Sequence, residues 1–205
     1  MRKERPDWPG QNPLWIDDFL APETCELIRE ELEFSFWRPS TVVRREAGGL
    51  LRDRRSKMRV SETTSADWFS PELSREIRKI ETRLTRVLGY TRERFEPWQA
   101  TRYGMGGKFD FHFDCGCWRE DPAGEREATL LLYLDSPARG GSTYFRDLGL
   151  TVEARAGRLL VWRNLLTNGE PDPRMIHSAA PVKSGKKTTL VTWVRQRTIR
   201  TNSGG

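Results

Sequence analysis

The sequence predicts a mainly β fold of α+β type, a sandwich or jelly roll with helices packed on one face. Two helix-like segments lie in the front half, and many short strand-like segments separated by turn residues follow from about residue 95. The chain has 205 residues, of which 36% are hydrophobic, enough for one substantial core. We find no repeat and no second domain. We therefore expect a single domain over residues 1–205, with a core from about 13 to 197 and flexible ends.

Two helices are expected in the front half. The first begins near residue 22, because Pro22 suits the first turn and apolar residues follow at near-helical spacing. In the second, Ser70 can cap, Pro71 can take the first helical position, and Gly89 can end the helix. Its apolar stripe consists of Leu73, Ile77, Ile80, Leu84 and Leu88. This stripe predicts a helix that lies against a sheet. Between the two helices, the basic segment 44–59 is interpreted as a solvated, mobile loop without chemistry.

The back half contains six segments with strand character. They are residues 95–103, 108–114, 128–135, 142–145, 150–162 and 186–197. Turn-forming stretches such as "SPARGG" and "TNGEPDP" separate some of them. This even spacing is the main argument for a jelly roll.

Charge and cysteine content narrow the class of protein. Lys and Arg number 35 against 29 Asp and Glu, and the excess of +6 is spread along the chain, which indicates solubility and at most an anionic partner. Three cysteines give no disulfide framework. No segment approaches 18 consecutive apolar residues, and no signal peptide is recognisable. We expect a cytoplasmic protein that does not interact with membranes.

The chemistry is concentrated in "KFDFHFDCGC". Because strand side chains alternate between two faces, His112 and Asp114 point to the same side, with Phe109, Phe111 and Phe113 on the other. The only other histidine of the chain is His177.

Two imidazoles and one carboxylate are the ligand set typical of non-haem Fe(II) oxygenases, which leaves coordination positions open. Two alternatives remain: a hydrogen-bonded pair of His112 and Asp114 in a core, or a zinc site completed by a thiolate of Cys115 or Cys117.

Three stretches carry a resemblance to a known family. The segments "HFD", "GGSTYF" and "NGEPDPRMIHSAAPVKSGKK" closely resemble the prolyl 4-hydroxylase branch of the Fe(II)- and 2-oxoglutarate-dependent oxygenases, and the resemblance extends from "PLWIDDFLAPETCELI" to "TWVR". It implies a double-stranded β-helix, a cupin-like jelly roll, with supporting N-terminal helices. It also implies Fe(II) held by His112, Asp114 and His177, with 2-oxoglutarate and O2 as cosubstrates and ascorbate as an auxiliary reductant.

The resemblance further implies the residues that bind the cosubstrate. A basic residue ten positions after the second histidine pairs with the distal carboxylate of 2-oxoglutarate in this family, and that position is Lys187. Lys183 and Lys186 lie nearby as competitors, and without the resemblance each lysine would be interpreted as a surface residue. The family also has a tyrosine ahead of the first histidine near the cosubstrate, which corresponds to Tyr103.

Substrate residues follow from the same resemblance. Arg126 and Trp193 correspond to positions that line the substrate groove, although a solvated strand-edge charge and a core aromatic residue are equally good interpretations. Phe109, three residues before His112, departs from the family pattern, because relatives commonly have a tyrosine there. The expected activity is hydroxylation of prolyl residues in a peptide or protein.

The sequence is also compatible with three other functions. The first is hydroxylation of a free amino acid or another small molecule, such as a natural-product intermediate, by an oxygenase of the same fold. The second is nucleic-acid demethylation, which draws only on the +6 charge and the basic stretch "RQRTIR". The third is a non-enzymatic metal-binding jelly roll. The sequence does not determine the oligomeric state.

Overall fold

The computed structural model describes residues 12–45 and 51–200. A seven-stranded sheet, the major sheet, has the order β1-β13-β9-β16-β7-β6-β2, and a five-stranded sheet, the minor sheet, has the order β12-β11-β14-β8-β5. Two further pairs, β3 with β4 and β10 with β15, complete the β structure of these residues.

The strands of the major sheet are β1 (Leu14–Ile16), β2 (Arg38–Pro39), β6 (Glu62–Ser65), β7 (Gln99–Tyr103), β9 (Arg126–Tyr133), β13 (Leu159–Arg163) and β16 (Lys187–Arg195). Those of the minor sheet are β5 (Arg59–Val60), β8 (Lys108–His112), β11 (Thr143–Phe145), β12 (Leu150–Val152) and β14 (His177–Ala179). The paired strands are β3 (Val42–Arg45), β4 (Leu51–Arg54), β10 (Arg139–Gly140) and β15 (Val182–Ser184). Short 3-10 turns cover Ala66–Trp68, Arg92–Arg94, Arg146–Leu148 and Pro173–Met175.

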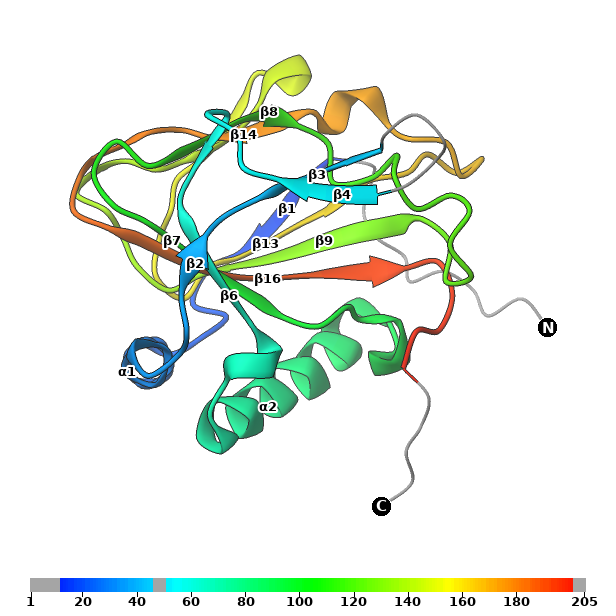
Figure 1. The fold of residues 1–205 in the computed structure, drawn as a ribbon. Coiled ribbons are helices and arrows are strands. Elements are labelled where there is room, and N and C mark those ends of the chain that lie inside the picture. The colour runs from blue at the N-terminus through cyan, green and yellow to red at the C-terminus, as the bar shows by residue number, and fades with distance from the viewer. Residues whose placement is uncertain (1–11, 46–50, 201–205) are drawn as a thin grey trace.

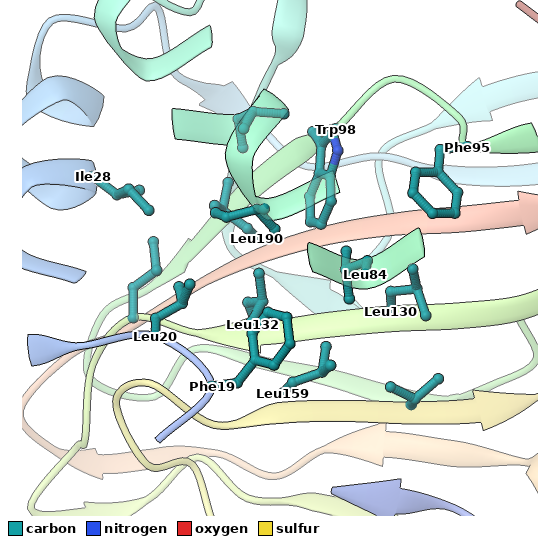
Figure 2. Packing of buried hydrophobic residues seen from close by; sticks show 14 of the residues in the cluster. Phe19, Leu20, Ile28, Leu84, Phe95, Trp98, Leu130, Leu132, Leu159 and Leu190 are labelled. Atoms are coloured by element: carbon teal, nitrogen blue, oxygen red, sulfur yellow. The ribbon is translucent and has the colours of Figure 1, made fainter. Parts of the chain in front are cut away.

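The two helices, α1 (Pro22–Glu33) and α2 (Pro71–Leu88), cover one face of the major sheet, as Figure 1 shows. The ends of α2 are as predicted: the Ser70 hydroxyl accepts a hydrogen bond from the backbone N–H of Leu73, and Gly89 adopts the left-handed conformation that ends the helix. The predicted α2 stripe is buried against Leu130, Leu132 and Leu190 of the sheet. Figure 2 shows this packing around Trp98 and Leu84.

Strand alternation divides the major sheet into an outer face under the helices and an inner face toward the minor sheet. On β9, Ala128, Leu130 and Leu132 belong to the helix-side core, whereas Tyr133 belongs to a second core that also contains Phe145 of the minor sheet. Because side chains alternate along a strand, Thr129 and Leu131 share the inner face with Tyr133. The inner faces of the two sheets therefore enclose the space in which a site can form.

The front half contains more β structure than the sequence predicted. Strands β1 to β6 lie there, and part of the segment 44–59, interpreted above as a mobile loop, pairs in the β3–β4 hairpin. This expectation was wrong because it rested on the basic composition of the segment. Composition does not show that Val42 and Arg54, twelve residues apart, pair in a hairpin. The tip of the hairpin, residues 46–50, lies outside the described residues, as do most of the ends predicted to be flexible.

In the described part of the chain, no helix is long and apolar enough to cross a membrane.

Candidate metal centre

The two histidines meet because strands β8 and β14 pair. His112 at the end of β8 lies directly opposite His177 at the start of β14. Asp114 follows β8 by two residues, and its Oδ1 lies 3.8 Å from His112 Nε2 while its Oδ2 lies 3.8 Å from His177 Nε2. One ligand atom from each of the three residues lies within 4.8 Å of the others. The predicted triad is thus a compact cluster.

A bulge in β8 alters the predicted facing of the aromatic residues. Ala179 lies opposite Phe109, and His177 lies opposite His112, so three residues of β8 are matched by two of β14. The extra residue places Phe109 and His112 on one face, where their rings stack with centroids 3.6 Å apart. The prediction that Phe109 shares a face with Phe111 was therefore wrong. Simple alternation does not hold across a bulge.

Hydrogen bonds fix both imidazoles in the form that a metal needs. The Nδ1 atoms of His112 and His177 lie 2.8 and 2.9 Å from the backbone oxygens of Asp110 and Met175. A carbonyl oxygen only accepts, so Nδ1 carries a proton in each ring, and the neutral form of each imidazole therefore presents its lone pair at Nε2. Burial, together with the adjacent His177, lowers the pKa of His112 to about 3, so this ring is neutral at pH 7.

Asp114 is held as an ionised carboxylate. Burial works to raise the pKa of Asp114, but His177, His112, Arg126 and the Thr129 hydroxyl together lower it below its ordinary value. The hydroxyl of Thr129 lies 2.7 Å from Asp114 Oδ2. The residues are suited to Fe(II), because one carboxylate oxygen and two imidazole nitrogens lie close together around a shared point.

The cysteines lie apart from this cluster. Cys115 is buried, and its Sγ donates to the backbone oxygen of Asn164 at 3.5 Å. Burial raises the pKa of the Cys115 thiol to about 12, so it remains protonated and is a poor ligand. Cys117 lines an outer groove. Neither thiol belongs to the ligand cluster in the described part of the chain.

A small inner cavity of about 70 Å³ lies between the metal cluster and Lys187. Lys187 is 2% exposed and lies directly opposite Tyr103 across strands β16 and β7. Its Nζ is 5.1 Å from the ring centroid of Tyr103 and 5.4 Å from that of Tyr133. Burial lowers the pKa of Lys187 to about 7, and no described carboxylate forms an ion pair with it.

The other two lysines do not reach this cavity. Lys183 and Lys186 are both exposed, and Lys186 lines a separate pocket beside α1. Burial therefore distinguishes the three lysines that the sequence offered as partners for the distal carboxylate of 2-oxoglutarate. Only Lys187 presents its ammonium to the cavity that contains the three metal ligands.

An outer groove of about 290 Å³ adjoins the inner cavity and shares Arg59, Phe109 and Trp193 with it. Residues of the β3–β4 hairpin line this groove. Figure 1 shows the two strands of the hairpin in front of the sheets. The groove runs from the metal cluster to solvent. It is large enough for part of an extended chain.

Arg126 is buried at the edge of the groove, in contrast to the interpretation as a solvated charge. Its guanidinium lies between the rings of Trp118 and Trp193, 3.7 and 3.6 Å from their centroids. Its Nε and Nη2 donate to the two carboxylate oxygens of Glu96 at 2.8 and 2.7 Å. The indole Nε1 of Trp193 is buried and has no hydrogen-bond partner among the described residues.

Comparison with known proteins identifies the fold around this site. Residues 98–195 match the family model described as the 2OG-Fe(II) oxygenase superfamily. The part of the chain that holds the three metal ligands and Lys187 therefore belongs to this superfamily. The family predicted from the sequence is confirmed, and the two sheets form the predicted double-stranded β-helix.

Curated relatives are similar to this chain over most of its length. The chain is 30% identical over 201 residues to prolyl 4-hydroxylase subunit alpha-1 of Gallus gallus, a match that covers 95% of this chain and 38% of the relative. It is 34% identical over 136 residues to prolyl 4-hydroxylase subunit alpha-2 of Caenorhabditis elegans, covering 63% of this chain and 25% of that protein. The chain thus spans well under half the length of these relatives.

Solved structures give the same result for the fold. A viral collagen prolyl hydroxylase from Paramecium Bursaria Chlorella virus-1 in complex with 2OG is 26% identical, with a TM-score of 0.68 and coverage of 91% of this chain and 97% of that one. A Pseudomonas putida prolyl-4-hydroxylase is 19% identical, with a TM-score of 0.62 and coverage of 91% and 94%.

Sequence reasoning missed two residues that line the site, Arg59 and Thr129. Arg59 lies in the segment to which no chemistry was assigned, yet it borders both cavities and its guanidinium carbon is 4.7 Å from the Phe109 ring centroid. Thr129 was counted only as part of a strand. The available signal was its position between Ala128 and Leu130. Because side chains alternate along a strand, a threonine between two core residues lies on the opposite face of the sheet, which here is the inner face.

Proposed function

We propose that this protein is an Fe(II)- and 2-oxoglutarate-dependent dioxygenase that hydroxylates prolyl residues of a peptide or protein. The observation that carries the proposal is the position of a buried, unpaired lysine at one end of a cavity whose other end is formed by two imidazoles and a carboxylate. A metal cluster alone gives no reason for such a lysine. A dicarboxylate that bridges metal and ammonium does.

Each ligand residue has a defined role in this proposal. His112 and His177 would bind the metal through Nε2, because their Nδ1 atoms are engaged by backbone oxygens. Asp114 would add the single negative charge that, with the two imidazoles, leaves coordination positions for cosubstrate and O2. When bound, the metal with 2-oxoglutarate and O2 supplies the oxidation, placing one oxygen atom in the substrate and one in succinate as CO2 leaves.

The chain would hold the cosubstrate by its far end. Lys187 would pair with the distal carboxylate, and the rings of Tyr103 and Tyr133 would exclude water around that pair. A buried ammonium without a counter-charge is unfavourable. The lysine is therefore arranged for an anion that arrives with the cosubstrate.

The substrate would lie in the outer groove. Arg126 has both faces covered by indoles and two donors occupied by Glu96, so its Nη1 remains to bind a backbone carbonyl. Because one face of the Trp193 ring already contacts Arg126, only its edge and its other face can contact a prolyl ring.

The Arg126 donor beside an open groove favours a peptide over a free amino acid. The names of the relatives support the same choice, since the viral neighbour is described as a collagen prolyl hydroxylase. A further neighbour of the same fold, a prolyl hydroxylase from Trichoplax adhaerens, is described in complex with a hypoxia inducible factor peptide fragment. Phe109 in place of the tyrosine common in relatives changes the polarity beside His112 and bears on the choice of substrate.

The alternatives drawn from the sequence receive less support. Zinc with a thiolate ligand is disfavoured because the Cys115 thiol hydrogen bonds to Asn164 and lies outside the cluster. Nucleic-acid demethylation rested on "RQRTIR", whose Arg195 and Arg197 are hydrogen bonded to backbone oxygens near Gly124 and Pro122. Those guanidiniums hold a loop in place.

The proposal is tested by competition between a short proline-rich peptide and free L-proline, with iron, 2-oxoglutarate and ascorbate present. Hydroxyproline is scored after hydrolysis, and succinate is measured in parallel. We expect hydroxyproline from the peptide. Turnover of the free amino acid alone would move the protein to small-molecule hydroxylation. Succinate without hydroxyproline from either would leave a dioxygenase and remove proline as its target.

A further inference from the structure

Two buried polar residues behind the metal cluster form a hydrogen-bonded chain that ends on Asp114. Thr129 and Asn164 are 0% and 1% exposed. The Thr129 hydroxyl donates to Asp114 Oδ2 at 2.7 Å, and the Asn164 side-chain N–H donates to the Thr129 oxygen at 3.0 Å. The Thr129 hydroxyl and the Asn164 side-chain amide take no part in strand pairing, because strand hydrogen bonds join backbone groups.

The direction of the chain follows from the number of protons. The Thr129 hydroxyl has one hydrogen, and its contact with Asp114 at 2.7 Å is shorter than its contact with the Asn164 side-chain oxygen at 3.4 Å. The carboxylate can only accept, so the hydrogen of Thr129 lies toward Asp114. The oxygen of Thr129 is then free to accept from Asn164.

Asn164 is itself held firmly. Its backbone N–H donates to the oxygen of Glu127 at 2.8 Å, and its backbone oxygen accepts from the N–H of Asp172 at 2.9 Å. The Cys115 thiol donates to the same oxygen. A residue anchored on both sides of its peptide can orient its neighbour without moving.

We propose that Thr129 and Asn164 are positioning residues that fix the rotation of the Asp114 carboxylate for metal binding. Asp114 is outside β8, so strand pairing does not restrain its side chain. The Thr129 hydroxyl occupies one lone pair of Oδ2 and keeps the carboxylate plane in one orientation. Without it, the carboxylate must be ordered when the metal binds. The inference rests on the proposed metal site, which supplies the ion to be held.

The test is a titration of the purified metal-free chain with Mn²⁺, followed by the EPR signal of the free ion. Thr129→Val replaces the hydroxyl by a methyl group of similar size, and we expect the Mn²⁺ dissociation constant to rise by about 10- to 100-fold. Thr129→Ser restores the donor and is expected to stay within about threefold of the wild type. Thr64→Val is the matched control, because Thr64 is a buried strand threonine of the same sheet whose hydroxyl has no described partner.

Asn164 is tested through its dependence on Thr129. Asn164→Ala is expected to weaken Mn²⁺ binding in the wild-type background and to change it no further in the Thr129→Val background, because Asn164 acts through that hydroxyl. Equal effects in both backgrounds would overturn the relay. Urea unfolding of every variant separates this readout from a loss of stability.

The outcomes separate this inference from the proposed function. Unchanged Mn²⁺ affinity in Thr129→Val, with binding lost in His112→Ala, would overturn the positioning role and leave the metal site standing. Unchanged affinity in His112→Ala would overturn the metal site itself. If Thr129→Val does not fold, Thr129→Ser and Asn164→Ala still test the inference. Weak Mn²⁺ binding by Thr129→Ser, or Mn²⁺ binding as tight as in the wild type by Asn164→Ala, would contradict it.

Discussion

Replacing Lys187 by methionine should stabilise the ligand-free protein and weaken 2-oxoglutarate binding, two effects of opposite sign. The side chain is 2% exposed, and burial lowers its pKa from the ordinary 10.5 to about 7. One pKa unit corresponds to about 1.4 kcal/mol, so at pH 7 the buried lysine costs the folded state about 4 kcal/mol relative to the unfolded chain. Methionine has a similar length and carries no charge.

The pH dependence has a definite sign. A lysine whose folded pKa lies below its unfolded pKa binds more protons when unfolded, so its cost is complete below about pH 7 and fades as the pH rises toward 10.5. We expect the unfolding free energy of Lys187→Met to exceed that of the wild type by about 2–4 kcal/mol at pH 7, with the difference falling at higher pH. Urea unfolding without metal or 2-oxoglutarate measures it.

Binding should change in the other direction. In the variant, the distal carboxylate of 2-oxoglutarate is buried without a partner, which costs about 3–5 kcal/mol, or about 150- to 4,000-fold in affinity. Calorimetric titration of the Mn²⁺-loaded protein provides the dissociation constant. Lys183→Met and Lys186→Met are the controls, because both lysines are exposed and neither lines the inner cavity. A less stable variant, an unchanged affinity, or an equal loss in Lys186→Met would refute the reasoning.

Four further predictions can be tested with the same material. Alanine at any of the three metal ligands should abolish Mn²⁺ binding and turnover while circular dichroism stays unchanged, and turnover with iron in any of them contradicts the site. At pH 8, 2-oxoglutarate binding to the wild type should take up about one proton, seen as a dependence of the heat on the buffer, whereas Lys187→Met should take up none. Arg126→Leu should lower kcat/KM for a peptide by about 10- to 150-fold and leave the 2-oxoglutarate affinity unchanged. The buried Glu96 carboxylate keeps an ion-pair partner in this variant, because Arg195 still pairs with it. An equal loss of kcat/KM in the exposed control Arg119→Leu would argue against a specific contact between Arg126 and the peptide. Glu81→Ala should cost about 2–3 kcal/mol in urea unfolding, since the buried indole N–H of Trp98 loses its acceptor, and an unchanged midpoint would contradict this.

The parts of the structure that could be predicted from the sequence are those that local chemistry decides. The cap at Ser70, the terminating Gly89 and the apolar stripe between them depend on contacts within a few residues, and all three were predicted. Most back-half strands were predicted because alternation and turn residues are local patterns, whereas the short strands β10, β14 and β15 lie outside the predicted segments. The ligand set was accessible for a different reason: the chain has only two histidines, and one lies two residues before an aspartate.

The remaining features depend on contacts between residues far apart in the chain. The β3–β4 hairpin, the bulge that brings Phe109 beside His112, and the burial of Arg126 between two indoles appear only when strands pair. Of three neighbouring lysines, composition could not say which is buried, and the register that sets Lys187 opposite Tyr103 decided it.

The sequence by itself thus determined which residue types could bind a metal and a dicarboxylate, because those properties belong to the side chains. Only the tertiary structure decided how these side chains are held. The hydrogen bond from Thr129 to Asp114 joins residues 15 apart, and that from Asn164 to Thr129 joins residues 35 apart. Orientation and burial arise from the packing of distant strands, and no local pattern encodes them.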